Sequence, residues 1–179
     1  MPPLPRGAAV VDLGCAPGAW LQVLVDQLGP EARLVGVDLV PVPELAGPVT
    51  LLELDITAPD APARIAKALG RPADAVLSDT APKLSGIPDV DRAAGDELCE
   101  AALRIAQELL VPRGTLVVKG FPGPESDRFR ARLRARFDRV SELRPEAKRS
   151  TSKEFYWLAC SGAPSGRGQL RRSRRGTRA

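Results

Sequence analysis

Short apolar runs of strand length recur along the first two thirds of the chain. They occupy residues 8–13, 33–39, 49–55, 73–79 and 114–120, and each is a nearly continuous stretch rich in Val, Leu and Ile. A strand with one solvated face alternates apolar and polar residues, whereas a parallel strand covered on both faces is apolar throughout. The pattern therefore predicts five parallel strands that are buried on both faces of one sheet.

Apolar residues at helical spacing lie between several of these runs. One such face ends at Gly29, and another ends before Pro112 and Gly114, which stop a helix. The faces consist of Leu21, Leu24, Val25 and Leu28; of Leu98, Ala102, Ile105 and Leu109; and, after Pro124, of Phe129, Leu133 and Phe137. Strands that alternate with helices through right-handed crossovers predict an α/β fold with a doubly wound, mostly parallel sheet.

The C-terminal part of the chain has a different pattern. Residues 137–145 and 154–160 are strand-like runs joined by the polar loop 146–153, and such a pair predicts a terminal antiparallel strand that closes the sheet. Residues 161–179 contain almost no apolar side chain, which predicts a disordered basic tail. Because no repeat or linker precedes this tail, we expect residues 1–160 to form one domain.

Composition excludes several classes of protein. The 179-residue chain has no histidine, which rules out histidine acid–base catalysis and most zinc sites. Its three scattered cysteines suit buried thiols in a reducing cytoplasm better than a disulfide framework or a metal site. No apolar run reaches the ~18 residues of a membrane helix, and the N-terminus lacks the apolar stretch of a signal peptide. We therefore expect a cytoplasmic monomer with no metal and no membrane partner.

The net charge of +4 conceals a strong segregation of charge along the chain. Residues 1–123 carry a net charge of −6, whereas residues 124–153 carry +5 and residues 161–179 add six arginines and no acid. A positive region of this kind is typical of a protein that binds a polyanion. A solvated helix face and a solubilising tail explain the same charges, so charge alone does not separate the two interpretations.

The turn after the first strand is the first candidate for a ligand site. The segment from Gly14 to Ala19 loosely fits the glycine pattern of a dinucleotide site, but Pro17 removes an N–H that a pyrophosphate would need. Asp38 ends the second strand, 20 residues after Gly18, where a carboxylate accepts ribose hydroxyls. Asp55 ends the third strand and is placed to bind an adenine amino group. These positions favour a nucleoside ligand without a phosphate, such as S-adenosylmethionine, over strand ends that are merely solvated.

A polar cluster is predicted beyond the ends of the later strands. Asp79 follows the fourth strand in SDTAP, Lys119 closes the fifth in VVKG, and Glu154 opens the last in SKEF. A lysine that ends an apolar strand is a poor structural choice, and partial burial would lower its pKa toward a proton-transfer role. The structural alternative is a lysine that extends its charged group into water. The presence of three polar residues, Asp79, Lys119 and Glu154, over neighbouring strand ends disfavours this alternative.

These segments, in this order and spacing, resemble the FtsJ/RrmJ family of ribosomal RNA 2′-O-methyltransferases. The motifs are VDLGCAPGAW, GVDLVP, SDTAPKLSG, VVKGF and SKEFYWLA, and they span roughly residues 8–160. The resemblance implies a Rossmann-like methyltransferase fold that uses S-adenosylmethionine to methylate a ribose 2′-hydroxyl, in bacterial members on a uridine of large-subunit rRNA. It places cofactor contacts at Gly18, Trp20, Asp38, Asp55 and Asp79, to which the turn adds Gly14, and catalytic roles at Asp79, Lys119 and Glu154.

One catalytic residue of that family has no counterpart here. The family's set is Lys-Asp-Lys-Glu, with the first lysine in a helix upstream of the glycine turn, but residues 1–9 contain three prolines and no lysine. Either the recorded start lies inside a longer reading frame, or this member is shortened and its activity is altered. Lys83 is a candidate for part of the missing charge. The arginines of residues 128–153 and of the tail are candidates to hold RNA phosphates.

Two other functions stay open at this point. An NAD-dependent oxidoreductase is compatible with the turn, but the single tyrosine, Tyr156, has no lysine four residues after it. A non-catalytic RNA- or partner-binding domain of the methyltransferase type is compatible with the missing lysine. Binding of S-adenosylhomocysteine rather than NAD would exclude the first function, and methyl incorporation into RNA would exclude the second.

Overall fold

The computed structural model describes residues 3–144 and 155–162, in which strands and helices alternate for most of the length. In chain order the elements are β1 (Ala9–Leu13), α1 (Ala19–Leu28), β2 (Arg33–Asp38), β3 (Val49–Glu53), α2 (Ala61–Leu69), β4 (Ala73–Ser78), α3 (Pro88–Leu109), β5 (Leu110–Gly120), α4 (Pro124–Arg134), β6 (Arg139–Leu143) and β7 (Phe155–Cys160). Glu154, the loop 146–153 and the tail from residue 163 onward lie outside the described residues.

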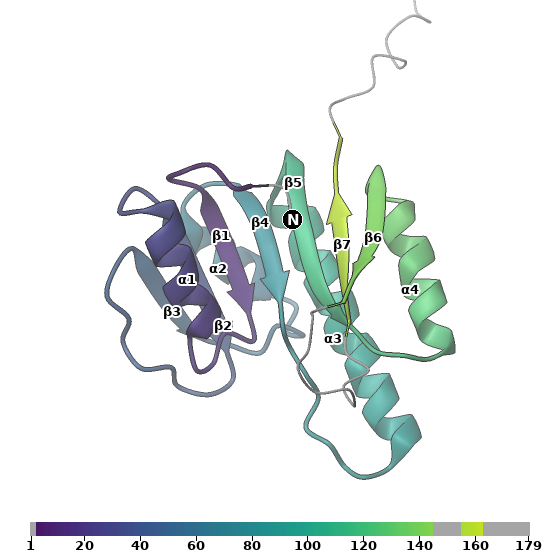
Figure 1. Cartoon of the computed structure of the whole chain (residues 1–179). Coiled ribbons are helices and arrows are strands. Elements are labelled where there is room, and N and C mark those ends of the chain that lie inside the picture. The colour runs from purple at the N-terminus through teal and green to yellow at the C-terminus, as the bar shows by residue number, and fades with distance from the viewer. Residues whose placement is uncertain (1–2, 145–154, 163–179) are drawn as a thin grey trace, which may run out of the picture.

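The described strands form a single sheet in the order β3-β2-β1-β4-β5-β7-β6 (Figure 1). The first five strands along the chain pair in parallel, and β7 runs antiparallel to both β5 and β6. This arrangement confirms the prediction of a doubly wound, mostly parallel sheet with an antiparallel strand near its end. The prediction of burial on both faces is wrong for β3, because this strand lies at the edge of the sheet and none of its residues is fully buried. The carboxyl ends of β1 to β5 all face the lower edge of the sheet in Figure 1.

Helices cover the two faces of the sheet unequally. Helix α1 buries Leu21, Leu24 and Leu28 on one face, against Val10 of β1 and Leu34 of β2. Helices α2, α3 and α4 pack on the other face, where their apolar residues share a core with β1, β4, β5 and β7. All three cysteines are buried free thiols, as expected. No helix in the described part of the chain is long and apolar enough to cross a membrane.

Two predicted boundaries and one element differ from the structure. Helix α3 ends at Leu109, so Pro112 and Gly114 belong to β5 and do not stop the helix. The strand tolerates Pro112 because pairing with β4 is interrupted there and becomes regular only from Thr115. Phe137 lies after the end of α4, although it is buried as its spacing indicated. Helix α2 was not singled out by the sequence pattern, although Gly70 caps it in the left-handed conformation.

Candidate active site

The glycine turn after β1 is shaped by contacts with the neighbouring strands. Gly14 has a φ of 76°, and a Cβ atom on it would lie 2.9 Å from Cγ2 of Thr80, so no other residue fits there. Its N–H donates to the carbonyl of Val37 at 2.8 Å, which ties the turn to β2. Gly18 has a φ of 104° and caps the N-terminus of α1. The turn is therefore a rigid connection between β1, β2 and the loop after β4.

Asp38 and Asp55 hold the backbone at the ends of β2 and β3. Asp38 accepts hydrogen bonds from the N–H of Ala16, at 2.9 Å, and of Val40, at 3.1 Å, and thereby joins its strand end to the glycine turn. Asp55 accepts from the N–H and the hydroxyl of Thr57, at 2.8 and 2.7 Å. Both carboxylates are thus fixed in position before any ligand binds.

These two acids line one cavity of about 210 Å³ together with Asp79. Its other lining residues are the turn residues Gly14 and Ala16, the apolar residues Val37, Leu39, Leu54, Ile56 and Leu98, and Thr80 and Ala81. Apolar walls with three carboxylates suit a flat heterocycle whose attached groups donate hydrogen bonds or carry positive charge. The cavity therefore matches the nucleoside ligand that the strand ends predict.

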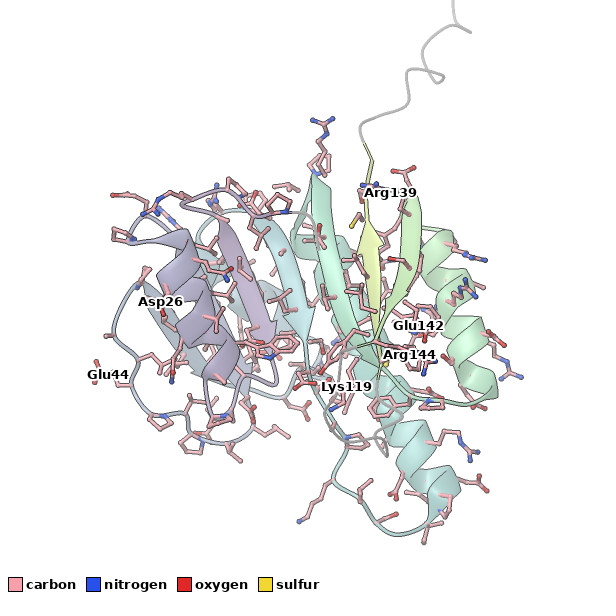
Figure 2. The ribbon with its side chains drawn as sticks, viewed as in Figure 1. Asp26, Glu44, Lys119, Arg139, Glu142 and Arg144 are labelled. Carbon is pink, nitrogen blue, oxygen red and sulfur yellow. The ribbon has the colours of Figure 1, made fainter. Side chains whose placement is uncertain are left out.

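Asp79, Lys119 and Tyr156 meet where β4 and β5 end and β7 begins. The Nζ atom of Lys119 lies 3.3 Å from Oδ1 of Asp79, and the hydroxyl of Tyr156 donates to the same oxygen at 2.7 Å. The Lys119 side chain is 13% exposed and that of Asp79 is 35% exposed, so the lysine is the better shielded of the two. Figure 2 shows Lys119 at the lower edge of the sheet, where the parallel strands end. The structure thus brings together Asp79 and Lys119, as the sequence predicts.

Tyr156 is a site residue that the sequence reasoning missed. The sequence alone relates Tyr156 only to the oxidoreductase alternative, whereas the antiparallel pairing of β7 with β5 sets Tyr156 opposite Lys119. Its ring also lies 5.8 Å from the ring of Trp20 on α1, centroid to centroid. Gly18 and Trp20 do not line the cavity that contains Asp38 and Asp55. The contact of Trp20 with the site is its ring contact with Tyr156. Lys83 is exposed and lines none of the cavities described.

Asp12 is a buried acid in β1, just before the glycine turn. It is 1% exposed, and neither carboxylate oxygen has a hydrogen-bond partner among the described residues. Burial, reinforced by the nearby carboxylates of Asp79 and then Asp38, raises the pKa of Asp12 to about 7. The negative potential of this region favours a ligand that carries positive charge.

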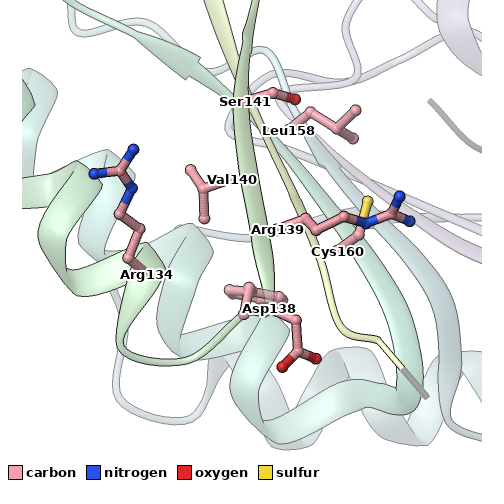
Figure 3. Close-up of a pocket in the computed structure, with 8 residues that line it drawn as sticks. Arg134, Asp138, Arg139, Val140, Ser141, Leu158 and Cys160 are labelled. Carbon is pink, nitrogen blue, oxygen red and sulfur yellow. The ribbon is translucent and has the colours of Figure 1, made fainter. Parts of the chain in front are cut away.

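A larger cavity of about 760 Å³ lies at the other end of the sheet (Figure 3). It is lined by residues of β6 and β7, including Arg139, Ser141, Leu158 and Cys160. Cys160 pairs with Thr115 near the start of β5, whereas Lys119 pairs with Tyr156 at the opposite end of the same ladder. This cavity is therefore remote from the acids and the lysine, and its size does not make it the candidate active site.

The fold and the site define a methyltransferase, and comparison with known proteins specifies which kind. The model of the FtsJ-like methyltransferase family matches residues 2–161. The chain belongs to this family. A relative from Myxococcus xanthus, named ribosomal RNA large subunit methyltransferase E, is 41% identical over 156 residues, which are 87% of this chain and 73% of the relative. This membership confirms the predicted family and enzyme class and removes the oxidoreductase alternative.

Solved structures show the same fold at low sequence identity. A Plasmodium falciparum chain classed as a ribosomal RNA methyltransferase superimposes with a TM-score of 0.74 at 20% identity and covers 87% of both chains. Human methyltransferase-like protein 13, solved in complex with S-adenosylhomocysteine, gives a TM-score of 0.62 at 18% identity and covers 89% of this chain and 73% of that one. Methyltransferases of the FtsJ-like family use S-adenosylmethionine, which confirms the predicted cofactor.

Proposed function

We propose that this protein transfers a methyl group from S-adenosylmethionine to a ribose 2′-hydroxyl of large-subunit rRNA, on a uridine. The observation that carries the proposal is the ion pair between the largely buried Lys119 and Asp79, which lines an acid-rich cavity suited to a nucleoside. Membership of the FtsJ-like family and the name of the Myxococcus xanthus relative support the choice of rRNA as substrate.

The residues around the cavity fit the cofactor. Asp38 is placed to accept the ribose hydroxyls, and Asp55 is placed to accept the adenine amino group, while the apolar walls hold the ring. Asp79 adds a third carboxylate to the lining, which suits the ammonium and sulfonium groups. We assign Gly14 and Gly18 to the turn that supports these contacts, and Trp20 to the wall behind Tyr156.

In the proposed reaction, residues of this chain remove the proton of the acceptor ribose 2′-hydroxyl. When bound, S-adenosylmethionine supplies a methyl group on a positively charged sulfur. The neutral amine form of Lys119 accepts the proton of the 2′-hydroxyl, and Asp79 holds the lysine in place across their 3.3 Å contact. Tyr156 fixes Asp79 in turn through its 2.7 Å hydrogen bond. Glu154, which lies outside the described residues, is proposed as a further orienting group on the strength of the family motif. The remaining acceleration comes from positioning.

Exposed arginines on and after α4 are proposed to hold the RNA backbone. Arg128, Arg134 and Arg136 are all exposed, whereas Arg132 forms an ion pair with Glu100 at 2.5 Å. Cationic side chains bind phosphates without reading sequence, so they fix the position of the RNA and leave selection of the nucleotide to the site. We expect the reaction to take place in the cytoplasm, by a monomer.

Replacement of Lys119 tests the catalytic proposal. We expect Lys119→Ala to lower the turnover number for RNA methylation by about 10²–10⁴-fold, because proton transfer loses its acceptor. Affinity for S-adenosylhomocysteine, measured by calorimetry, should change less than threefold, since Lys119 does not line the cofactor cavity. Lys67→Ala, at an exposed lysine of α2, is the matched control. Turnover by Lys119→Ala that equals the wild type would disprove the assigned role.

A further inference from the structure

A second cavity lies on the other side of the Asp79–Lys119 pair. It has a volume of about 400 Å³ and is enclosed by the loop between β4 and α3 and by the residues after β5. Lys119 lines this cavity, whereas Asp79 lines the cofactor cavity, and Ala81 lines both. A group in one cavity and a group in the other would therefore meet at the proposed catalytic pair.

The walls of the second cavity are apolar and partly exposed. Pro82 and Leu84 come from the loop before α3, and Phe121 and Pro122 come from the segment after β5. Leu84 is 76% exposed, more than any other large hydrophobic side chain in the described residues. An exposed aliphatic side chain and an aromatic ring that line one cavity are costly to leave in water, and they suit a flat ring that packs against both.

Two contacts hold these walls in place. The carboxylate of Asp91 accepts hydrogen bonds from the N–H and the hydroxyl of Ser85, at 2.7 and 2.6 Å, and from the N–H of Gly86 at 3.2 Å, which fixes the loop next to Leu84. The ring of Phe121 rests on Gly95 of α3, where a Cβ atom would come within 3.2 Å of it. The cavity is thus formed before a ligand arrives.

The charged groups of this cavity suit a nucleotide. Arg92 lines it and pairs with Asp89 at 2.9 Å, but Asp89 is 90% exposed and such a surface pair is easily exchanged for a phosphate. Asp91, in the first turn of α3, already accepts three hydrogen bonds from Ser85 and Gly86 of the preceding loop, so its carboxylate is directed to that loop. Lys119 and Arg92 thus offer cationic groups on an apolar cavity.

We infer that this cavity binds the acceptor nucleotide itself: its base lies between Leu84 and Phe121, and its phosphate is held by Arg92. The base is then out of any stack, and its ribose is held at the Asp79–Lys119 pair. This inference rests on the proposed function, because it assigns the substrate side of the same site. It makes Leu84 and Phe121 determinants of base recognition.

An RNA with one missing base tests the assignment directly. Two synthetic rRNA fragments would carry the methylated nucleotide either intact or as an abasic ribose that keeps its 2′-hydroxyl. On intact RNA, Leu84→Ser and Phe121→Leu should each lower kcat/KM by about 10-fold, through lost stacking. The kcat/KM of the wild type should be about 10-fold lower on abasic RNA than on intact RNA. On abasic RNA, neither variant should have a lower kcat/KM than the wild type. Affinity for S-adenosylhomocysteine should be unchanged, and Val23→Ser, at an exposed position of α1, should match the wild type.

Arg92 is tested by salt dependence. Arg92→Gln should lower the slope of log Kd for RNA against log salt by about one, whereas Arg64→Gln, at an exposed arginine of α2, should leave it unchanged. Equal losses by the Leu84 and Phe121 variants on intact and abasic RNA, or no loss on either, would overturn the assignment and leave the proposed function standing. Absence of methyl transfer to any rRNA by the wild type would overturn both.

Discussion

Asp12 is the residue whose chemistry the fold changes most. Its carboxyl has a pKa of about 7 in the folded protein, raised from 3.8 by burial and then by Asp79 and Asp38. Between about pH 4 and pH 7 the unfolded chain therefore loses this proton while the folded chain keeps it. The contribution of the Asp12 carboxyl to the free energy of unfolding therefore falls as the pH rises through that window, and it does not fall further above about pH 7.

The first prediction concerns Asp12→Asn in the absence of ligand. Because the amide does not ionise, the variant escapes this loss, and its unfolding free energy relative to the wild type should improve by on the order of a few kcal/mol between pH 4 and pH 8. Urea unfolding at several pH values measures the difference. Asp26→Asn, at an exposed position of α1, is the control and should show no such trend. A difference for Asp12→Asn that does not vary with pH would contradict the buried carboxyl.

Site residues differ in how far the sequence could indicate them. Four site residues could be predicted from the sequence, because each lies at or just after the end of an apolar run that indicates a parallel strand, and such strands end at one edge of the sheet. They are Asp38, Asp55, Asp79 and Lys119. Tyr156 could not be predicted, because its contact with Asp79 depends on the antiparallel register of β7 against β5, and no local sequence pattern encodes this register. Its hydrogen bond joins residues 77 positions apart.

At the scale of elements, the contact of α1 with the sheet depends on one small residue. Gly36 lies in the middle of β2, and a Cβ atom there would come within 2.6 Å of Leu21 Cδ1 and 2.9 Å of Cys15 Sγ. Helix α1 can therefore approach the sheet closely enough to place the glycine turn beside Asp38. The sequence indicated this helix through its apolar face but could not indicate how closely it packs.

The second prediction tests this close packing. Gly36→Ala should lower the free energy of unfolding by about 1–3 kcal/mol, because the added methyl group overlaps Leu21 and Cys15. Leu21→Ala makes room for that methyl group, so the double variant should lose less than the sum of the two single losses. Urea unfolding of the three variants gives the coupling. Strict additivity would show that the helix adjusts and that the contact is not tight.

The bounds of an element can be predicted where its apolar periodicity continues to its ends. They cannot be predicted where tertiary contacts determine where the element begins or ends. Helix α3 begins at Pro88, ten residues before its first predicted core residue, and this first part bears exposed side chains such as Val90. It extends beyond the sheet in Figure 1, below the ends of the strands. No core pattern marks such a segment, yet it carries Arg92 and helps to form the second cavity.

At the scale of the whole molecule, charge is segregated between the cofactor side and the proposed RNA side. Acids surround the cofactor cavity, while the arginines on and after α4 are exposed. Such an arrangement attracts RNA over a long range and limits its contact with the acid-lined cavity. The sequence showed this segregation, but only the fold shows that α4 lies on the same face of the sheet as α3.

The third prediction follows from that segregation. The double variant Arg128→Gln/Arg136→Gln should lower the slope of log Kd for rRNA against log salt by about two, because each arginine accounts for about one displaced counterion. Its affinity for S-adenosylhomocysteine should stay within twofold of the wild type. Filter binding at several salt concentrations measures the slope. An unchanged slope would place the RNA on another surface of the protein.

The identity of the methylated product tests the central claim most directly. Large-subunit rRNA from cells that lack this methyltransferase, free and in assembled subunits, would be incubated with the protein and S-adenosylmethionine, digested to nucleosides and analysed by mass spectrometry. We predict 2′-O-methyluridine at a stoichiometry approaching one per rRNA in the wild-type reaction and almost none with Lys119→Ala. A methyl group found only on a base, or on no RNA at all, would contradict ribose 2′-hydroxyl transfer by the Asp79–Lys119 pair.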